Sequence, residues 1–225
     1  MIHPNMATML AFITTDVNIS ADCLKSALLT VVADSFNMLS VDGDTSTNDT
    51  VAILASGLAG NERIETKSAE YATFVAALAA ICEKLVKLMA KDGEGATKLV
   101  ECVVSGAKTK EIAKACAKSV ICSSLVKAAM FGADANWGRI LCALGYAGVN
   151  IDVNKVDVYF KSAGGEILVC KNGAGVEFSE EKAKEILVKD EVYIIVKLND
   201  GEFSANAYGC DLTYDYVKIN GDYRT

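Results

Sequence analysis

KSAEYATFVAALAAICEKLVKLMAK, residues Lys67 to Lys91, carries apolar side chains at intervals of three and four. These side chains are Tyr71, Phe74, Val75, Leu78, Cys82, Leu85, Leu88 and Met89. Residues at this spacing line one face of an α-helix, so the stretch predicts a long amphipathic helix. An apolar helix face has to be buried against another element, which favours a layered fold.

Short apolar runs rich in strand-forming residues surround this helix. They predict strands over 9–15, 50–55, 99–104, 156–160, 166–170, 191–196 and 202–207. The strands over 9–15 and 50–55 are expected to be buried. A helix of about 15 residues is expected after Ser20, whose hydroxyl suits a helix start. Its core face would carry Leu24, Leu28, Val31, Val32 and Phe36. Further helices are expected over 109–130, 135–145 and 182–187.

The order of these elements lacks a regular alternation of strand and helix, so it predicts an α+β fold of mixed layers. The pattern changes near Gly148, where helices give way to strands. We therefore expect an α/β layered core over 1–148 and a smaller C-terminal α+β subdomain over 149–225.

Composition limits the kinds of partner and the cellular compartment that can be expected. The 225 residues include 29 acidic and 22 basic side chains, a net charge of −7. Nucleic acid is a poor partner for such a chain, because binding to phosphates needs clustered Lys and Arg. No apolar run approaches the ~20 residues of a membrane span, and residues 1–5 lack signal-peptide features. We expect a cytoplasmic protein without a membrane partner.

The eight cysteines form no CxxC pair, and most lie among apolar neighbours. This pattern favours reduced, buried thiols over disulfides. His3 is the only histidine, so neither a zinc site nor a Ser/His/Asp triad is expected, and no metal is predicted.

One segment offers a different kind of nucleophile. In HPNMATMLAF, residues 3–12, a polar stretch meets the first predicted strand at Ala7-Thr8. Cleavage of that peptide bond would leave Thr8 with a free α-amine beside its own hydroxyl. The amine, with a pKa of about 7.7–8.0, can act as general base for the hydroxyl near neutral pH.

The residues around this segment also resemble a known family. Residues 1–10 look like the autocleavage segment of the ornithine acetyltransferase family, the bifunctional glutamate N-acetyltransferases of arginine biosynthesis. Four further blocks resemble family blocks in the family's order: SVDGDTSTNDT at 40–50, KDGEGATK at 91–98, NWGRI at 136–140 and the terminal stretch 211–225. The resemblance runs the whole length of the chain.

The resemblance implies an N-terminal-nucleophile-like layered architecture, with Thr8 in the core over 1–148. It implies a precursor that cuts itself at Ala7-Thr8 into α and β chains, which assemble as an α2β2 heterotetramer. Thr8 would take acetyl from N-acetyl-L-ornithine and pass it to L-glutamate through an acetyl-threonine intermediate. No cofactor is implied, although some members also accept acetyl-CoA as co-substrate.

By the same resemblance, Glu94, Asn220 and Thr225 complete the substrate site beside Thr8. A carboxylate such as that of Glu94 suits the ammonium group of an amino-acid substrate. The family's oxyanion donors come from the α chain, of which only seven residues precede the cut here.

Other blocks favour structural roles. Asp42, Asp44 and Asp49 lack the spacing of a calcium loop and predict a polar loop that bonds its own backbone. Trp137 and Arg139 are expected to pack or to pair. Two further readings remain open: an N-terminal-nucleophile aminopeptidase that hydrolyses its acyl-enzyme, and an inert β chain that needs its α chain for activity.

Overall fold

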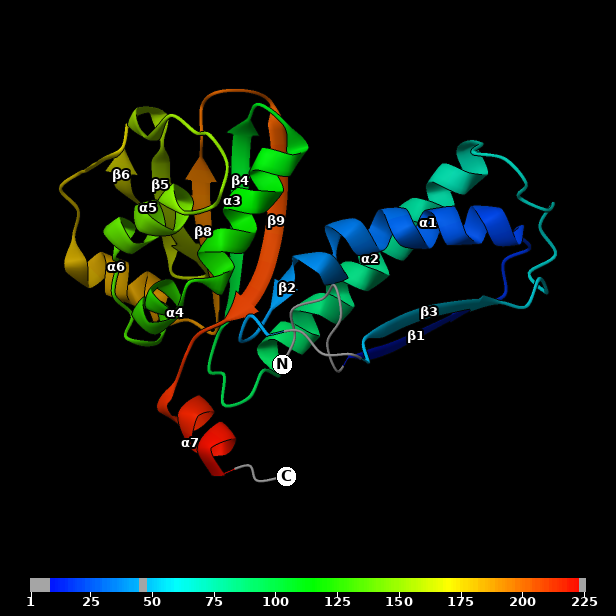
Figure 1. Ribbon diagram of the computed structural model, residues 1–225, viewed down its shortest axis with the longest axis horizontal. Helices are drawn as coiled ribbons and strands as arrows, with labels where there is room; N and C mark the ends of the chain where they lie inside the picture. The colour runs from blue at the N-terminus through cyan, green and yellow to red at the C-terminus, as the bar shows by residue number, and fades with distance from the viewer. Residues whose placement is uncertain (1–8, 45–47, 223–225) are drawn as a thin grey trace. The chain divides into compact units, whose positions relative to one another are not determined.

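The computed structural model describes residues 9–44 and 48–222 of the chain (Figure 1). The chain divides into two compact units, Met1–Val86 and Lys87–Thr225. The long helix α2 (Ala69–Lys91) confirms the amphipathic pattern of residues 67–91 and contributes residues to both units. Strands and helices are mixed in both units, as an α+β fold requires.

The first unit is built on two parallel strands, β1 (Leu10–Thr15) and β3 (Thr50–Ala55), as predicted for 9–15 and 50–55. Between them the chain forms α1 (Ala21–Asp34), the 3-10 helix η1 (Phe36–Met38) and β2 (Leu39–Ser40). Helix α1 begins where expected, because the Ser20 hydroxyl accepts a hydrogen bond from the Cys23 N–H at 3.3 Å.

The buried face of α1 differs from the expected one. Val31 and Phe36 are buried as predicted, whereas Leu24, Leu28 and Val32 are only half-buried. Besides Val31, the buried positions of the helix are Cys23 and Ala27. Small side chains let a helix approach its neighbours closely, and this displaces the larger residues towards the rim.

The second unit contains a mixed sheet in which β9, β4, β8, β5, β6 and β7 are neighbours in that order. The strands are β4 (Leu99–Ala107), β5 (Asp157–Ser162), β6 (Gly165–Lys171), β7 (Ala174–Gly175), β8 (Glu191–Lys197) and β9 (Phe203–Cys210). The β4–β8 pair is parallel, and the other pairs are antiparallel. The five strands predicted beyond residue 98 all belong to this sheet.

Helices cover this sheet. Helix α3 (Lys110–Cys122) packs on β4 and β9, and α6 (Glu180–Leu187) packs on β5 and β6. Helix α5 (Trp137–Gly145) packs against α3. Because the sheet takes strands from both sides of residue 148, that residue does not separate two sheets. The division into domains over 1–148 and 149–225 stays a prediction.

The single helix predicted over 109–130 is wrong. The structure has two helices there, α3 and α4 (Ser124–Phe131), separated at Ser123. Ser123 adopts an extended backbone conformation, and its hydroxyl accepts a hydrogen bond from the Val126 N–H at 3.4 Å. The apolar periodicity of the sequence continues across residue 123. The Ser123 side chain nevertheless caps a new helix there, and the first helix ends.

The end of α2 is attached to the sheet by a charged contact. Lys87 Nζ lies 3.0 Å from a carboxylate oxygen of Glu101, a buried residue of β4. The other oxygen of Glu101 accepts a hydrogen bond from the Asn206 side chain at 2.8 Å. Lys87 also lies over the Tyr208 ring, 5.6 Å from its centre. This attachment fixes the point from which the chain leaves α2.

All eight cysteines are free, and six of them are buried. The prediction of reduced, buried thiols is therefore confirmed for most of them, with Cys142 exposed and Cys122 half-buried. Burial raises the pKa of Cys82 and that of Cys116 to about 11, so these two thiols stay protonated at neutral pH. Among the described residues, no helix is long and apolar enough to cross a membrane.

Candidate functional site

The proposed nucleophile, Thr8, lies outside the described residues, and so do Ala7 and Thr225. The described chain begins one residue later, at the buried Met9. Its N–H donates a hydrogen bond to the Asp49 carboxylate, and its carbonyl accepts one from the Thr50 N–H at 2.7 Å. Hydrogen bonds at both its N–H and its carbonyl thus fix the backbone of Met9 at the start of β1.

Asp49 occupies an unfavourable environment for a carboxylate. Burial raises its pKa, and the hydrogen bond from the Met9 N–H acts in the opposite direction. The oxygen Oδ2 of Asp49 is buried without a hydrogen-bond partner among the described residues. The sequence analysis assigned Asp49 only to a polar loop and did not anticipate this contact with the first strand.

The remainder of that loop behaves as predicted where it is described. The Asp44 N–H donates to the Asp42 carboxylate at 3.2 Å, which is a turn stabilised by its own side chain. Residues 45–47 of the loop lie outside the described residues.

Glu94, the predicted substrate ligand, lies in a short loop that follows α2. The loop, residues 92–98, leads directly into β4, and the Glu94 side chain is exposed. Gly95 adopts a φ of +65°, a conformation that favours glycine. A side chain at Gly95 would lie 2.7 Å from the backbone nitrogen of Tyr216, so only glycine fits this approach.

A buried carboxylate fixes the second half of the same loop. Asp211 Oδ1 accepts hydrogen bonds from the N–H groups of Thr97 at 2.8 Å and Lys98 at 3.1 Å. Its other oxygen accepts one from the Thr97 hydroxyl. Burial lowers the pKa of Lys98, an effect opposed by the charge of Asp211, and the Lys98 ammonium donates to the Met130 carbonyl at 2.5 Å.

Asn220, the other described site residue, lies on α7 (Tyr214–Asp222) near the end of the chain. Its side-chain amide donates to the Tyr216 carbonyl at 3.0 Å. Helix α7 and the loop that carries Glu94 are in contact, because Gly95 lies against Asp215 and Tyr216. The structure therefore brings together the two elements that bear Glu94 and Asn220, which lie 126 positions apart in the sequence.

Trp137 and Arg139 have the structural roles that the sequence analysis expects. Gly175 lies against the Trp137 ring, which leaves no room for a side chain there. Arg139 donates to the Leu125 carbonyl at 2.9 Å and so ties α5 to α4.

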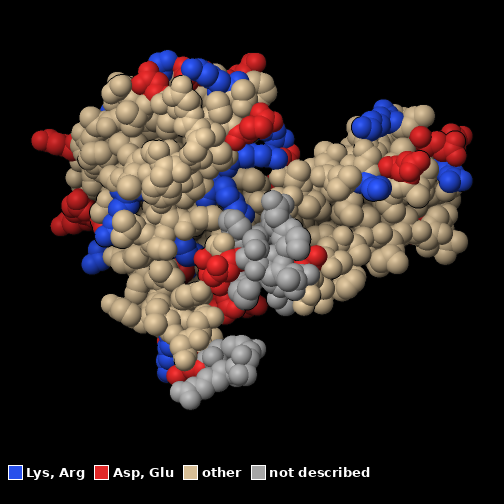
Figure 2. Space-filling view, in the orientation of Figure 1, with Lys and Arg blue, Asp and Glu red and all other residues tan. Residues whose placement is uncertain are grey.

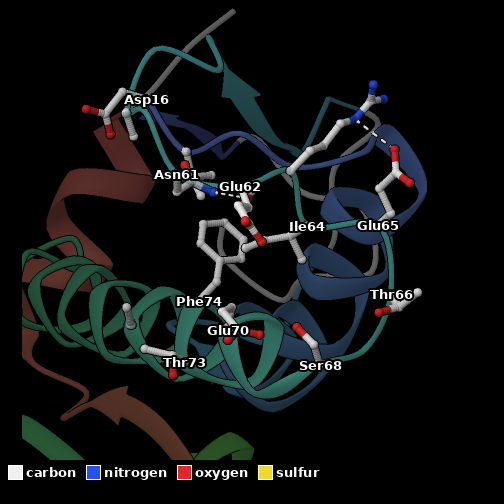
Figure 3. A pocket seen from close by; sticks show the side chains of 14 residues that line it. Asp16, Asn61, Glu62, Ile64, Glu65, Thr66, Ser68, Glu70, Thr73 and Phe74 are labelled. Carbon is white, nitrogen blue, oxygen red and sulfur yellow. Dashed lines mark hydrogen bonds and ion pairs between the residues drawn. The ribbon is translucent and has the colours of Figure 1, made fainter.

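The sequence analysis missed a cavity in the first unit. It has a volume of about 830 Å³, within the range of ligand pockets, and lies between the segment 59–68 and α2. The Phe74 ring points from α2 towards Asn61 and Glu62, and Arg63 pairs with Glu65 at 3.4 Å (Figure 3). The polar run NERIET at 61–66 is the only sequence signal for it, and such a run is typical of any surface loop.

Charges on the visible face of the molecule are interspersed. Lys, Arg, Asp and Glu side chains lie in small scattered groups between wider uncharged areas over the described part of that face (Figure 2). Among the described residues, no group of three or more His, Cys, Asp and Glu side chains could hold a metal ion. The expectation that the protein uses no metal stays a prediction.

Comparison with known proteins identifies the chain's relatives. A family model described as the ArgJ family matches residues 1–225. The chain belongs to the ArgJ family. The arginine biosynthesis bifunctional protein ArgJ 1 of Clostridium acetobutylicum is 56% identical over all of this chain and 55% of its own length. The ArgJ protein of Caldanaerobacter subterraneus is 53% identical over all of this chain and 56% of its own length.

A solved ArgJ structure has the same fold. The crystal structure of the arginine biosynthesis bifunctional protein argJ from Bacillus halodurans matches with a TM-score of 0.91 and 47% identity. The match covers 96% of this chain and 100% of that chain. The expected family and its layered architecture are thereby confirmed. This chain spans about half the length of the curated ArgJ relatives it matches.

Proposed function

We propose that this chain is part of an acetyltransferase of arginine biosynthesis, which moves acetyl from N-acetyl-L-ornithine to L-glutamate. The observation that carries the proposal is the ArgJ match over residues 1–225, with relatives more than 50% identical along the whole chain. That match includes the segment around Ala7-Thr8, the loop of Glu94 and the terminal block with Asn220.

The chemistry follows from a threonine at a chain start. The α-amine of Thr8 takes the hydroxyl proton while Oγ attacks the acetyl carbonyl of N-acetylornithine. The tetrahedral intermediate collapses by breaking the C–N bond, and the proton passes to the departing amine of ornithine. The amine of glutamate then attacks the acetyl ester, and Oγ recovers its proton. Acetyl transfer thus needs no external oxidant or reductant.

The described residues contribute substrate contacts. The exposed Glu94 carboxylate suits the ammonium group of an amino acid. Asn220 lies on α7, which contacts the same loop, and offers an amide for a polar substrate group. Thr225 would add a further polar contact, as the family resemblance implies. No metal or bound cofactor takes part, and acetyl-CoA is an optional second acetyl donor.

Self-cleavage at Ala7-Thr8 would create this nucleophile. The solved chain from Bacillus halodurans is covered completely by this chain, whereas the curated ArgJ sequences are nearly twice as long. A solved family chain of about half the curated length is what cleavage of a longer precursor at this position would produce. The hydrogen bonds that hold Met9 to Asp49 and Thr50 would keep the new chain start in place.

A partner chain would complete the site, as an α chain in an α2β2 heterotetramer. The β1–β3 pair supports this proposal, because two strands alone make an unstable sheet. Helix α1 contacts this pair, while Leu10 and Phe12 are 65% and 67% exposed and Leu54 is 58% exposed on the strands. Such an apolar face is typical of a surface that another chain covers. The eight free thiols suit a reducing compartment such as the cytoplasm.

The proposal is tested by replacing Thr8 in the protein expressed at the full family length. Thr8→Ala removes the hydroxyl, and we expect it to abolish both cleavage and acetyl transfer, with at least a ~1000-fold loss of rate. Thr8→Ser is the matched control, because it retains a hydroxyl beside the amine and should keep both reactions. Cleavage is read by mass spectrometry and transfer by N-acetylglutamate formation.

Retained transfer in Thr8→Ala would point to another nucleophile and overturn the proposal. Free acetate is measured in the same assay. Acetate as the main product would favour the aminopeptidase-like hydrolase. Activity of the co-expressed chains with none in the isolated chain would show that this chain is inert without its partner.

A further inference from the structure

Helix α7 carries Asn220 but has no buried side chain of its own. Its apolar residues Tyr214, Val217 and Ile219 are all exposed. Most helices in proteins are held in place by packing of an apolar face. The Tyr214 ring makes one edge-on contact with the Phe131 ring of α4, with 5.5 Å between the ring centres. Beyond that contact, the position of α7 has to be set by hydrogen bonds.

The residue before α7 supplies that attachment. The Thr213 hydroxyl accepts a hydrogen bond from the Tyr216 N–H at 3.2 Å, which caps the first turn of the helix. The same hydroxyl donates to the Gly95 carbonyl at 2.7 Å. A hydroxyl has one proton to donate and lone pairs to accept, so one Thr213 side chain serves both contacts. We call this pair of hydrogen bonds the Thr213 bridge.

The Thr213 bridge joins the two elements that carry the described site residues. On one side it holds the carbonyl of the residue next to Glu94, and on the other it starts the helix that bears Asn220. Thr213 is buried, so water competes little for these two hydrogen bonds. Asp211, two residues earlier, anchors Thr97 and Lys98 of the same loop.

We propose that Thr213 is a positioning residue of the substrate site, which sets Glu94 and Asn220 at one fixed separation. The proposal rests on the proposed function for the roles of Glu94 and Asn220. It adds that substrate affinity depends on a buried hydroxyl that itself touches no substrate. Without the bridge, Asp211 would still hold Thr97 and Lys98, but the segment of Glu94 and Gly95 would lose its hydrogen bond to the start of α7, and the separation of Glu94 and Asn220 would vary more.

Thr213→Val tests this, because valine has the shape of threonine without the hydroxyl, and Thr213→Ser is the matched control that keeps it. In the full-length enzyme we expect Thr213→Val to raise KM for glutamate about tenfold with little change in kcat. Thr213→Ser should restore KM. In a Glu94→Gln background, Thr213→Val should raise KM by a smaller factor than in the wild type, because the Glu94 contact is already lost and only Asn220 is still displaced.

An unchanged KM in Thr213→Val would overturn the proposal. A double variant whose increase in KM equals the product of the increases in Thr213→Val and Glu94→Gln would overturn it too. Hydrogen exchange on the purified chain gives a readout independent of activity. Thr213→Val should raise exchange in 94–97 and in 214–222 together, while Thr213→Ser should not. Separate responses of the two segments would contradict the bridge. A wild-type enzyme that transfers no acetyl would refute the proposed function, and the exchange result would still decide the bridge.

Discussion

At the scale of single residues, Gly95 is a position where the backbone leaves little choice of side chain. Its φ of +65° is strained for any other residue, and a Cβ atom would lie 2.7 Å from the Tyr216 nitrogen. We predict that Gly95→Ala lowers stability by about 2–4 kcal/mol, because strain and displacement of α7 add together. Thermal unfolding measures the loss.

Gly148→Ala is the matched control for this change. Gly148 has a similar φ of +74°, but no atom lies within 4 Å of the position of an added Cβ. It therefore carries the backbone strain without the close approach, and about 1 kcal/mol is expected. Equal losses in the two variants would show that contact with α7 contributes nothing.

The sequence predicts substrate-binding roles for Glu94 and Asn220 by resemblance, and these roles stay predictions, but it did not predict the residues that support them. Glu94 and Asn220 lie in blocks that match the family. Asp211 and Thr213 lie in one of the same blocks, yet nothing local shows that they reach Gly95 and Thr97, more than 110 positions earlier. Such contacts depend on the pairing of β4 with β9, which a single sequence does not reveal.

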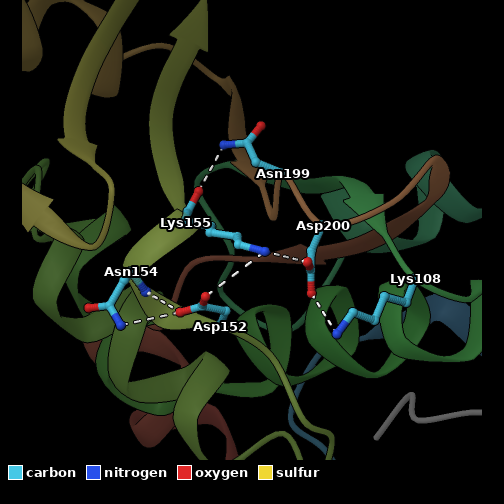
Figure 4. Close-up of polar contacts among 6 residues, drawn as sticks. All are labelled: Lys108, Asp152, Asn154, Lys155, Asn199 and Asp200. Atoms are coloured by element: carbon cyan, nitrogen blue, oxygen red, sulfur yellow. Dashed lines mark hydrogen bonds and ion pairs between the residues drawn. The ribbon is translucent and has the colours of Figure 1, made fainter.

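At the scale of elements, an ion-pair cluster joins the loops at one end of the second unit's sheet (Figure 4). One carboxylate oxygen of Asp200 accepts a hydrogen bond from Lys155 Nζ at 2.6 Å, and the other oxygen lies 2.9 Å from Lys108 Nζ. The hydrogen bonds from Lys155 and from Lys108 hold the pKa of Asp200 below its usual value. A carboxylate with a lowered pKa stabilises the fold above its unfolded-state pKa, and this contribution is lost as pH falls through the folded-state pKa.

We therefore predict that Asp200→Asn lowers the melting temperature at neutral pH and that the difference from wild type shrinks as pH falls below about 4. Glu185→Gln is the control, because Glu185 and Lys182 form an exposed pair within α6 at 3.0 Å. It should leave the pH profile unchanged. A difference for Asp200→Asn that stays constant down to low pH would contradict the role of its charge.

Elements with strong periodicity were predicted well, and the errors lie where side chains interrupt it. The pattern of residues 67–91 and the strands followed from apolar spacing alone. The break at Ser123 did not, because its apolar neighbours continue the helical period and only the hydroxyl's contact with Val126 reveals a second start. The inner face of α1 was misassigned for a related reason, since small Cys23 and Ala27 permit the closest packing.

At the scale of the whole molecule, the exposed strands of the first unit are the feature that this chain alone does not explain. Short apolar runs correctly predicted the strands β1 and β3, but the expectation that both strands are buried was wrong, because Leu10, Phe12 and Leu54 are exposed on one face. The curated ArgJ relatives have nearly as much sequence again as this chain. A partner supplied by that remaining sequence would account for the uncovered face.

The most direct test of the central claim is mass spectrometry of the active full-length enzyme after brief mixing with N-acetylornithine without glutamate. We predict a chain that begins at Thr8 and carries one acetyl group on its first residue, which disappears when glutamate is added. An active enzyme whose chain is intact across Ala7-Thr8, or whose acetyl group lies on any other residue, would contradict the account.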